Sequence, residues 1–420
     1  MSRDEFCDDL IDFLDSSPTA YHASSLVASR LERCGFVEVD ERVGWKEIPR
    51  RGMVRRDGAI ICWIAPDQLS LRSQARIYGA HSDSPAMKMK PRGSFEASGF
   101  TLADIEVYGG ALLHTWFDRD LKIAGRLVCS DGSIRLVETD PCARISSLAI
   151  HLDRGQSDQL CLDRQRDLMP IIGLEGIDLN RYIASACGCE AEDIVASDLY
   201  FVSAEKAQRL GCDRELLASS RMDNLLSVYC GLRACEQAEV SEDLQIFVVF
   251  EHEEIGSGTI SGACGTLLES ILKRITAHHG YSADDYEAFC ARSICLSADV
   301  THAHHPMRAA HYDPHVFPQI AHGPTVKWSA AMRYATDAVG TAEFLSACRK
   351  AGVNDQVFVN HGNIPGGSTI GSLVATRLGI RNVDAGIPIL SMHSVREVCA
   401  WKDCYDFTAM VSSFLEGRWT

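Results

Sequence analysis

Histidine and carboxylate side chains recur at places where a β-strand is predicted to end or a helix to begin. These residues are His81, Asp223, Glu253, Glu254, Asp299 and His393. Imidazole and carboxylate groups suit Zn²⁺, Co²⁺ or Mn²⁺ as ligands. In open α/β sheets, ligands bind beyond the carboxyl ends of the strands, so distant chain segments can meet there. The pattern favours a metal site.

Two metal ions would divide these residues between them. One ion would take His81 and the other His393, with a carboxylate shared between the two. Ions roughly 3.5–4 Å apart can activate a water and polarise a carbonyl, and a free carboxylate then serves as general base. The adjacent Glu253 and Glu254 offer one ligand and one base, because neighbouring side chains need not point to the same place. Asp83 lies close enough to His81 to orient its imidazole.

Each of these features also has an ordinary interpretation. A His-x-Asp triplet is usually found on the surface, a Glu-Glu pair usually lies on a solvated helix face, and an Asp after a strand often caps a helix. Their joint occurrence at element boundaries is what favours a metal centre.

Strands and helices alternate in the parts of the chain that would position these residues. Helical spacing of apolar residues predicts helices over residues 5–15, 21–34 and 222–238. Apolar runs predict buried strands over residues 76–80, 244–250, 293–298 and 384–390. A capping box from Ser394 to Glu397 predicts the start of the last helix, which runs on toward Phe414.

Between these parts lies a region of different character. Short alternating runs and a hairpin-type turn at 130–133 predict a β-rich module from about residue 91 onward. The simplest organisation is therefore an α/β catalytic domain built from residues 1–88 and 216–420. A β-rich unit over residues 89–215 would be inserted into it.

Composition excludes several classes of protein. The formal net charge of −16 argues against a nucleic-acid partner, which needs a basic patch. No run of about 18 apolar residues predicts a membrane span, and the start of the chain lacks a secretory signal. The 17 cysteines are odd in number, scattered, and without a C-x-x-C pair, which is typical of a reducing compartment. The expected location is the cytoplasm.

Ten short segments along the chain carry a resemblance. They are SPTAYHA (17–23), AHSDSP (80–85), WFDRDL (116–121), IHL (150–152), SRMDNL (220–225), EHEEIGS (251–257), SADVTHA (297–303), RYATD (333–337), GGSTIG (366–371) and MHSVRE (392–397). In this order they resemble the motifs of the M18 metallopeptidases, the aspartyl aminopeptidase family. The resemblance runs over almost the whole chain. It implies an α/β fold, in which helices flank a mixed sheet of the zinc-aminopeptidase type and a mainly β dimerisation domain is inserted.

The resemblance also implies roles for individual residues. The ligands of two zinc ions per subunit would be His81, Asp223 and Asp299 for one, and Asp223, Glu254 and His393 for the other. Glu253 would be the general base. His151, from the inserted domain, would reach an active site, that of a neighbouring subunit included, and steady the tetrahedral intermediate.

The implied activity is removal of single residues from the free N-termini of short peptides. Several family members prefer N-terminal Asp or Glu, and Lys327 stands where the family carries a matching lysine, although an ordinary strand-edge lysine is the alternative. His302 is the expected substrate contact. The implied assembly is a homo-oligomer built from dimers, up to a tetrahedral shell of twelve subunits that excludes folded proteins.

Departures from the family pattern fall near the expected pocket. Met307 replaces a usual Asn, Gly366 stands where Cys is common, and the stretch from Met307 to Gln319 is rich in His, Arg and Pro. Histidines also recur over residues 302–322. We interpret most of these histidines as wall or loop residues. The departures leave the side-chain preference open.

Two alternatives remain at this point. A di-zinc carboxypeptidase or N-deacylase would need an arginine for a terminal carboxylate, and Arg221, Arg333 and Arg396 are available for that role. A non-catalytic shell or cargo-binding protein would keep only the fold. Retention of every proposed ligand together with Glu253 argues against the second alternative.

Overall fold

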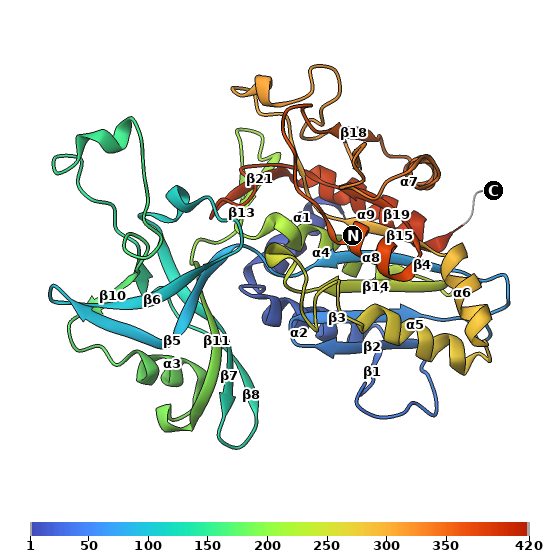
Figure 1. The fold of residues 1–420 in the computed structure, drawn as a ribbon, viewed down its shortest axis with the longest axis horizontal. Helices are drawn as coiled ribbons and strands as arrows, with labels where there is room; N and C mark the ends of the chain where they lie inside the picture. Colours follow the sequence, from blue (N-terminus) through green and yellow to red (C-terminus); the bar gives the residue numbers. More distant parts are fainter. Residues whose placement is uncertain (1, 418–420) are drawn as a thin grey trace.

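A nine-stranded sheet forms the centre of the molecule, and helices cover both of its faces (Figure 1). The computed structural model describes residues 2–417. The strands, in spatial order, are β1 (Val37–Glu38), β2 (Arg51–Arg56), β3 (Ala59–Ile64), β14 (Leu244–Phe250), β4 (Ala75–His81), β15 (Ile294–Ala298), β19 (Arg381–Gly386), β17 (Thr325–Trp328) and β18 (Gln356–Val359).

Two apolar cores lie on opposite sides of this sheet. The helices of the first core are α1 (Arg3–Asp15), α2 (Ala20–Arg33), α4 (Met222–Gln237), α7 (Ala338–Ala351) and α9 (Trp401–Glu416). Those of the second are α5 (Leu267–His278), α6 (Ala283–Arg292) and α8 (Ile370–Leu378). In the described part of the chain, no helix is both long and apolar enough to cross a membrane.

The middle of the sheet is parallel and buried on both faces. β4 pairs in parallel with β14 on one side and with β15 on the other. Every residue of these three strands is buried, which explains their near-continuous apolar sequences. Because they run in the same direction, their carboxyl ends lie side by side at one edge of the sheet.

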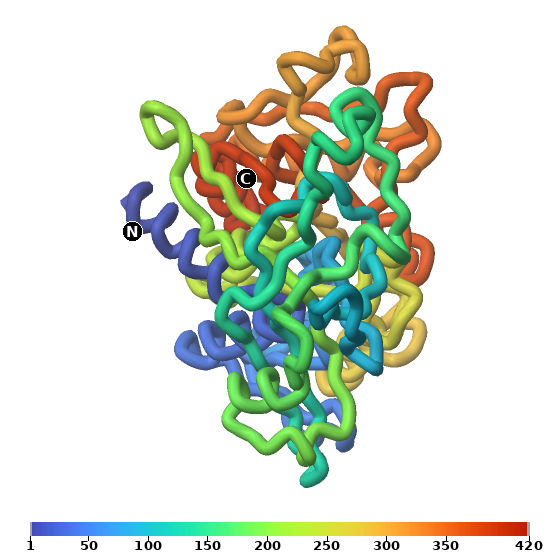
Figure 2. Tube along the Cα trace, turned by 90° about the vertical axis from the view of Figure 1, so that its left-hand side faces the viewer, coloured from blue at the N-terminus to red at the C-terminus, as the bar shows by residue number. Residues whose placement is uncertain are grey.

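A second sheet of seven strands stands beside the first (Figures 1 and 2). In spatial order its strands are β11 (Ile194–Ser203), β5 (Ala86–Ala97), β6 (Phe100–Tyr108), β10 (Ile171–Leu174), β9 (Ala143–Arg144), β7 (Asp120–Cys129) and β8 (Ile134–Glu138). β11 pairs with both β5 and β7, so the sheet curls back on itself around its own core. Helix α3 (Leu179–Cys187) contacts β8.

A small third sheet connects segments from several parts of the chain. Its strands are β12 (Gln208–Leu210), β13 (Leu216–Ser219), β21 (Glu397–Ala400), β20 (Pro388–Leu390) and β16 (Thr301–His302). Strand β21 brings the segment before the last helix against the segment that leads into α4.

Two of the predicted elements are wrong. The capping box at Ser394 does not open a helix: Glu397 begins strand β21, and α9 starts at Trp401. The Glu397 side chain accepts hydrogen bonds from distant backbone amides instead of capping a helix. The apolar run 384–390 is two strands, β19 and β20, that belong to different sheets. They part at Gly386, where any Cβ would meet the Asp299 carbonyl oxygen.

Candidate metal centre

Three of the candidate segments meet at the carboxyl edge of the parallel strands. His81 is the last residue of β4, Asp299 follows β15, and Glu253 and Glu254 lie in a short 3₁₀ helix, η4 (Glu253–Ile255), just after β14. Asp223 lies in the first turn of α4. The order and direction of the strands, and the turns that follow them, set these positions.

The structure brings five candidate ligands into two groups that share one residue. The groups are His81, Asp223 and Asp299, and Asp223, Glu254 and His393. Within each group the ligand atoms all lie within 4.8 Å of one another. A carboxylate that belongs to both groups is the arrangement required of a bridging ligand.

Distances in the first group match a tetrahedral ion. His81 Nε2 lies 3.4 Å from Asp223 Oδ1 and 3.6 Å from Asp299 Oδ1. A tetrahedral Zn²⁺ with bonds of about 2.1 Å separates its ligand atoms by roughly 3.4 Å.

The second group has the same spacing. His393 Nε2 lies 3.2 Å from Asp223 Oδ2 and 3.4 Å from Glu254 Oε2. The two oxygens of Asp223 therefore face different histidines, one in each group.

Each histidine is held with its Nε2 facing the carboxylates. His81 Nδ1 lies 3.1 Å from the Asp83 carbonyl oxygen, and His393 Nδ1 lies 3.0 Å from that of Gly110. A carbonyl oxygen can only accept, so both Nδ1 atoms donate. In the neutral ring the Nε2 lone pair then faces the carboxylates, which is the usual arrangement for metal-binding histidine.

Asp83 positions the two adjacent glutamates. Its carboxylate accepts hydrogen bonds from the backbone amides of Glu253 (3.1 Å) and Glu254 (3.2 Å), and from the Tyr108 hydroxyl (2.7 Å). One side chain thus orients the whole η4 turn as well as lying beside His81. Glu254 points into the second group, whereas Glu253 belongs to neither group and lines the adjoining pocket.

Glu397 plays a similar part on the other side, and the sequence did not reveal it. Its buried carboxylate accepts from the backbone amides of Asp223 (3.1 Å) and His393 (2.8 Å). Burial, with repulsion from Asp223, raises the pKa of Glu397 to about 8. The motif that contains Glu397 was visible, but its resemblance to a helix cap concealed the role.

Four residues at the centre adopt left-handed backbone conformations that side chains disfavour. They are Arg221 (φ 61°), His252 (φ 65°), Ser391 (φ 60°) and His393 (φ 66°). Each either is a candidate ligand or precedes one by at most two residues. Such strain persists only where the surroundings enforce it, and it often occurs at functional sites.

The charges of the centre call for a cation. Burial and the neighbouring Asp223 raise the pKa of Glu254 well above its ordinary value. Burial, with Asp299 and Asp223 adding repulsion, raises the pKa of Glu253 to about 7. Although burial opposes its charged form, the hydrogen bond to Asp223 raises the pKa of His393 to about 10.

Two carboxylate oxygens at the centre are buried without a hydrogen-bond donor. They are Asp223 Oδ1 and Glu254 Oε1. A buried polar atom that lacks a partner is costly, and here each belongs to a proposed ligand group. The donor set of imidazole and carboxylate, its spacing, and these orphaned oxygens together fit a pair of divalent ions such as Zn²⁺.

A pocket of about 400 Å³ opens beside the two groups, and its lining includes Glu253, Lys327 and His302. Lys327 is buried, with its Nζ 3.0 Å from Asp299 Oδ2 and 5.4 Å from the centre of the Tyr334 ring. The structure therefore places both predicted substrate contacts at the candidate centre.

His151 is the predicted site residue that the structure does not bring to the centre. It lies in an exposed turn between β9 and β10, in a segment that extends away from the seven-stranded sheet (Figure 2). It does not line the pocket beside the metal centre.

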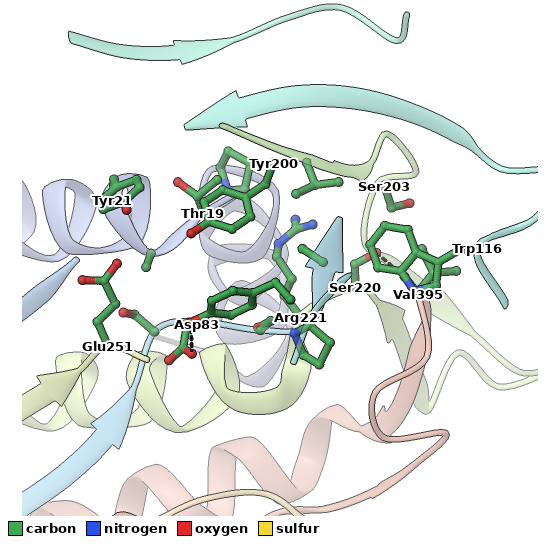
Figure 3. A pocket seen from close by; sticks show the side chains of 18 of the residues that line it. Thr19, Tyr21, Asp83, Trp116, Tyr200, Ser203, Ser220, Arg221, Glu251 and Val395 are labelled. Atoms are coloured by element: carbon green, nitrogen blue, oxygen red, sulfur yellow. Dashed lines mark hydrogen bonds between the residues drawn. The ribbon is translucent and has the colours of Figure 1, made fainter. Parts of the chain in front are cut away.

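A second cavity is lined by Tyr108 among others and, as Figure 3 shows, by Asp83 and Arg221. The Arg221 guanidinium donates to the carbonyl oxygens of Ser17 and Leu14, so it fastens the connection between α1 and α2. None of Arg221, Arg333 and Arg396 lines the pocket beside the metal centre. Among the described residues, this pocket is lined by no arginine, so the three arginines named for the carboxypeptidase alternative are not at the metal ligands.

Comparison with known proteins decides the family. The family model described as Aminopeptidase I zinc metalloprotease (M18) matches residues 13–415. The chain belongs to the M18 family. The resemblance inferred from the ten motifs is thereby confirmed, and the chain is an M18 zinc aminopeptidase, a peptide hydrolase.

Named M18 relatives cover nearly the whole chain. A protein of Streptomyces avermitilis named "Probable M18 family aminopeptidase 2" is 45% identical over 98% of this chain and 97% of its own. A protein of Pseudomonas putida with the same name is 37% identical over 99% of each chain.

Solved M18 structures share the fold. The structure titled as the Ape4 and Nbr1 complex superposes with a TM-score of 0.95 at 31% identity, over 99% of this chain and 86% of that chain. The mApe1 dodecamer of S. cerevisiae gives 0.84 at 28% identity, over 98% of this chain and 96% of that chain. The predicted fold class, a mixed sheet flanked by helices with a β-rich insertion, is confirmed.

Proposed function

We propose that this M18 aminopeptidase uses two zinc ions and the general base Glu253, and that it prefers N-terminal Asp or Glu. The observation that carries the proposal is the pair of ligand groups joined through Asp223, with Glu253 beside them in neither group. His81, Asp223 and Asp299 would hold one ion. Asp223, Glu254 and His393 would hold the other, and Co²⁺ or Mn²⁺ could substitute.

When bound, the ions would supply positive charge that acidifies a water molecule and polarises the scissile carbonyl. The residues of the chain divide the remaining work. Glu253 would accept the proton of the attacking water and return it to the leaving amine. The free α-amine of the substrate would lie against the carboxylates of the centre. Asp83 would keep Glu253 in place through its backbone amide.

Lys327 is the proposed determinant of the acidic preference. Its ammonium group has three donors, and the described contacts give one of them to Asp299. The remaining donors, together with His302 in the same pocket, could take the side-chain carboxylate of an N-terminal Asp or Glu. This local cation would offset the net charge of −16, which repels acidic substrates at long range.

We also propose a homo-oligomer in which residues 89–215 form the dimerisation unit and residues 1–88 and 216–420 form the catalytic unit. Exposed apolar side chains along the β-rich region, including Ile134, Leu148 and Leu174, support a contact there. The similar mApe1 is described as a dodecamer. In such an assembly His151 would reach a neighbouring subunit's centre. The free state of all 17 cysteines supports a cytoplasmic location.

Exchanging Glu253 tests the proposal most directly. The Glu253→Gln variant keeps every proposed ligand, so we expect it to retain two zinc ions per chain while kcat falls by a factor of about 10²–10⁴. Elemental analysis and release of the N-terminal residue from Asp-, Glu-, Ala- and Lys-initiated peptides measure the two quantities. Wild-type turnover in this variant would remove Glu253 from the mechanism.

Matched controls separate the parts of the proposal. Glu239→Gln makes the same exchange on the exposed segment before β14, at the far end of that strand, and should leave turnover unchanged. N-acetylated versions of the same peptides should resist cleavage if a free amine is required. Equal rates for acidic and other N-termini would contradict the role of Lys327 without touching that of Glu253.

A further inference from the structure

A separate basic pocket adjoins the metal centre. It encloses about 400 Å³, and His302 lines both this pocket and the one beside the metal ligands. We call it the basic pocket and define it by His302, His305, Arg308, His311 and His361. Among the residues that the structure describes, no carboxylate lines the basic pocket, although the molecule as a whole is strongly acidic.

Two chain segments form the walls and are fastened to each other. One follows β16 and the other follows β18, and a backbone bridge joins Tyr312 to Asn360. The Tyr312 hydroxyl donates to the Ala303 carbonyl oxygen (2.8 Å). The His302 ring packs edge-on against Phe358, with ring centres 5.7 Å apart. These contacts make the basic pocket a defined site rather than a loose surface loop.

Two of its histidines are fixed as hydrogen-bond donors. The backbone amide of Met307 donates to His305 Nδ1, and that of Asn363 donates to His361 Nδ1, each at 3.2 Å. An Nδ1 atom that accepts a hydrogen bond carries no proton, so the neutral ring carries its proton on Nε2. Both rings therefore offer an Nε2–H donor without needing a positive charge.

Arg308 supplies the permanent charge of the basic pocket. Its side chain is exposed, and in the described part of the chain it has no ion pair with a carboxylate. A guanidinium beside two imidazole N–H groups is a donor set that suits a carboxylate. Gly366, one of the departures from the family pattern, is part of the lining, and the amide that holds His305 is the main chain of Met307, another departure.

The two adjoining pockets have opposite character. Asp223, Glu253 and Glu254 line the first, which suits the positive N-terminus of a peptide. Arg308 and the histidines line the second, which suits a negative group. Because His302 lines both pockets, a peptide that places its N-terminus in the first can extend its following residues toward the second.

We propose that the basic pocket binds a carboxylate on the leaving-group side of the scissile bond. That carboxylate is either the C-terminus of a di- or tripeptide or the side chain of an acidic residue on the C-terminal side of the cleaved bond. The proposal rests on the aminopeptidase function proposed above and adds a second determinant of specificity. It concerns the leaving peptide alone and is independent of the N-terminal preference assigned to Lys327.

Peptides that share one N-terminal residue test the basic pocket alone. We would compare Asp-Ala-Ala with a free C-terminus, Asp-Ala-Ala-amide and Asp-Glu-Ala-amide. The free acid should be cleaved with a kcat/KM about tenfold higher than its amide, the effect of one charge-assisted contact. If the side chain of an acidic second residue also reaches the pocket, Asp-Glu-Ala-amide recovers this advantage; if only the C-terminus does, it behaves as the amide.

Exchange of Arg308 identifies the residue responsible. In Arg308→Gln the tenfold ratio should fall to about twofold or less, and Arg308→Lys should keep part of it. Arg72→Gln, an exposed arginine before the start of β4 and so at its opposite end from the centre, should keep the full ratio. A wild-type enzyme that does not distinguish acid from amide, or an Arg308→Gln variant with an unchanged ratio, would overturn the proposal.

Calorimetry separates this inference from the proposed function. The same three peptides are titrated into zinc-loaded Glu253→Gln protein, where no turnover is needed, and the Kd of acid and amide should differ by a similar factor. Failure to release an N-terminal residue from any peptide would refute the aminopeptidase proposal. Equal Kd values for acid and amide would refute the basic pocket.

Discussion

Two carboxylates that are not candidate ligands hold the centre together. Asp83 accepts from the backbone amides of Glu253 and Glu254, and Glu397 accepts from those of Asp223 and His393. Each therefore fixes two candidate site residues through their main chain. Groups around metal ligands commonly change metal affinity by 10–100-fold when they are altered.

We predict that Glu397→Gln weakens metal binding without unfolding the protein. Glutamine keeps one acceptor oxygen, so one of the two backbone amides, that of Asp223 or that of His393, loses its partner. Zinc affinity should fall about tenfold or more. Zinc retained after dialysis against graded chelator concentrations measures the effect, with Glu239→Gln as the matched exchange. Identical chelator curves for both variants would show that Glu397 has no positioning role.

Among individual residues, the sequence predicted the proposed ligands better than the side chains that hold them in place. The proposed ligands could be named because histidine and carboxylate recur together at several element boundaries and because they lie in family motifs. Glu397 and Tyr108 could not, since their partners lie 174 and 25 residues away in the sequence. Such pairings depend on which segments the fold brings together, and local pattern carries no information about that.

Among the elements, helix α9 shows how one buried acid can couple a loop to a helix. Asp403 lies in its first turn, and its carboxylate accepts from the backbone amides of Ala321 (2.6 Å) and Gly323 (2.9 Å). Its burial raises the pKa of Asp403 to about 7. The folded state thus holds this proton more tightly than the unfolded chain, whose Asp has a pKa near 3.9.

We predict that Asp403 makes the fold less stable as pH rises from about 4 to about 7. Over that range the unfolded chain loses the proton first, so ionisation favours unfolding, and the loss levels off above pH 7. The rise in the pKa of Asp403 corresponds to a loss of at most about 4 kcal/mol in the free energy of unfolding.

The side chain in Asp403→Asn cannot ionise, so this variant should lose the pH-dependent part of the stability. One missing hydrogen bond should also lower its free energy of unfolding by about 1 kcal/mol. Denaturant unfolding at pH 5 and pH 7.5 measures the change. The stability of the parent should fall further between the two pH values than that of the variant. Asp213→Asn, on the exposed loop between β12 and β13, should follow the parent. Parallel behaviour of Asp403→Asn and the parent would contradict the prediction.

The elements were predictable where burial imposes a single pattern. Strand β14 (Leu244–Phe250) and helix α4 were recognisable because an unbroken apolar run and a helical stripe have one common explanation each. The pair β19 and β20 was not, because the run stays apolar across Gly386 while the chain changes sheets. The cause is contact with Asp299, which only the assembled fold contains.

For the whole molecule, the metal ions and the fold should stabilise each other. Buried carboxylates at the centre face one another with too few donors, so the protein without cations carries unrelieved repulsion. A ligand at a hundred times its Kd contributes about 2.7 kcal/mol to stability. We predict that chelation lowers the Tm by several degrees and that added Zn²⁺ restores it.

Differential scanning calorimetry with and without chelator checks this prediction. A variant with His81→Ala and His393→Ala removes one ligand from each group and should melt at the same temperature in both conditions. A wild-type protein whose Tm does not respond to chelator would mean that the centre holds no cation that stabilises the fold.

In the sequence, the seven-stranded sheet lies between the first two proposed ligands. β4 ends at His81, the sheet's strands run from Ala86 to Ser203, and the chain reaches Asp223 soon afterwards. The same region also grips the last ligand: Gly110 accepts from His393, and the Leu112 amide donates to the His393 carbonyl. A movement of that sheet would therefore change the spacing between the two ligand groups. Any partner that holds the sheet in place would also fix that spacing.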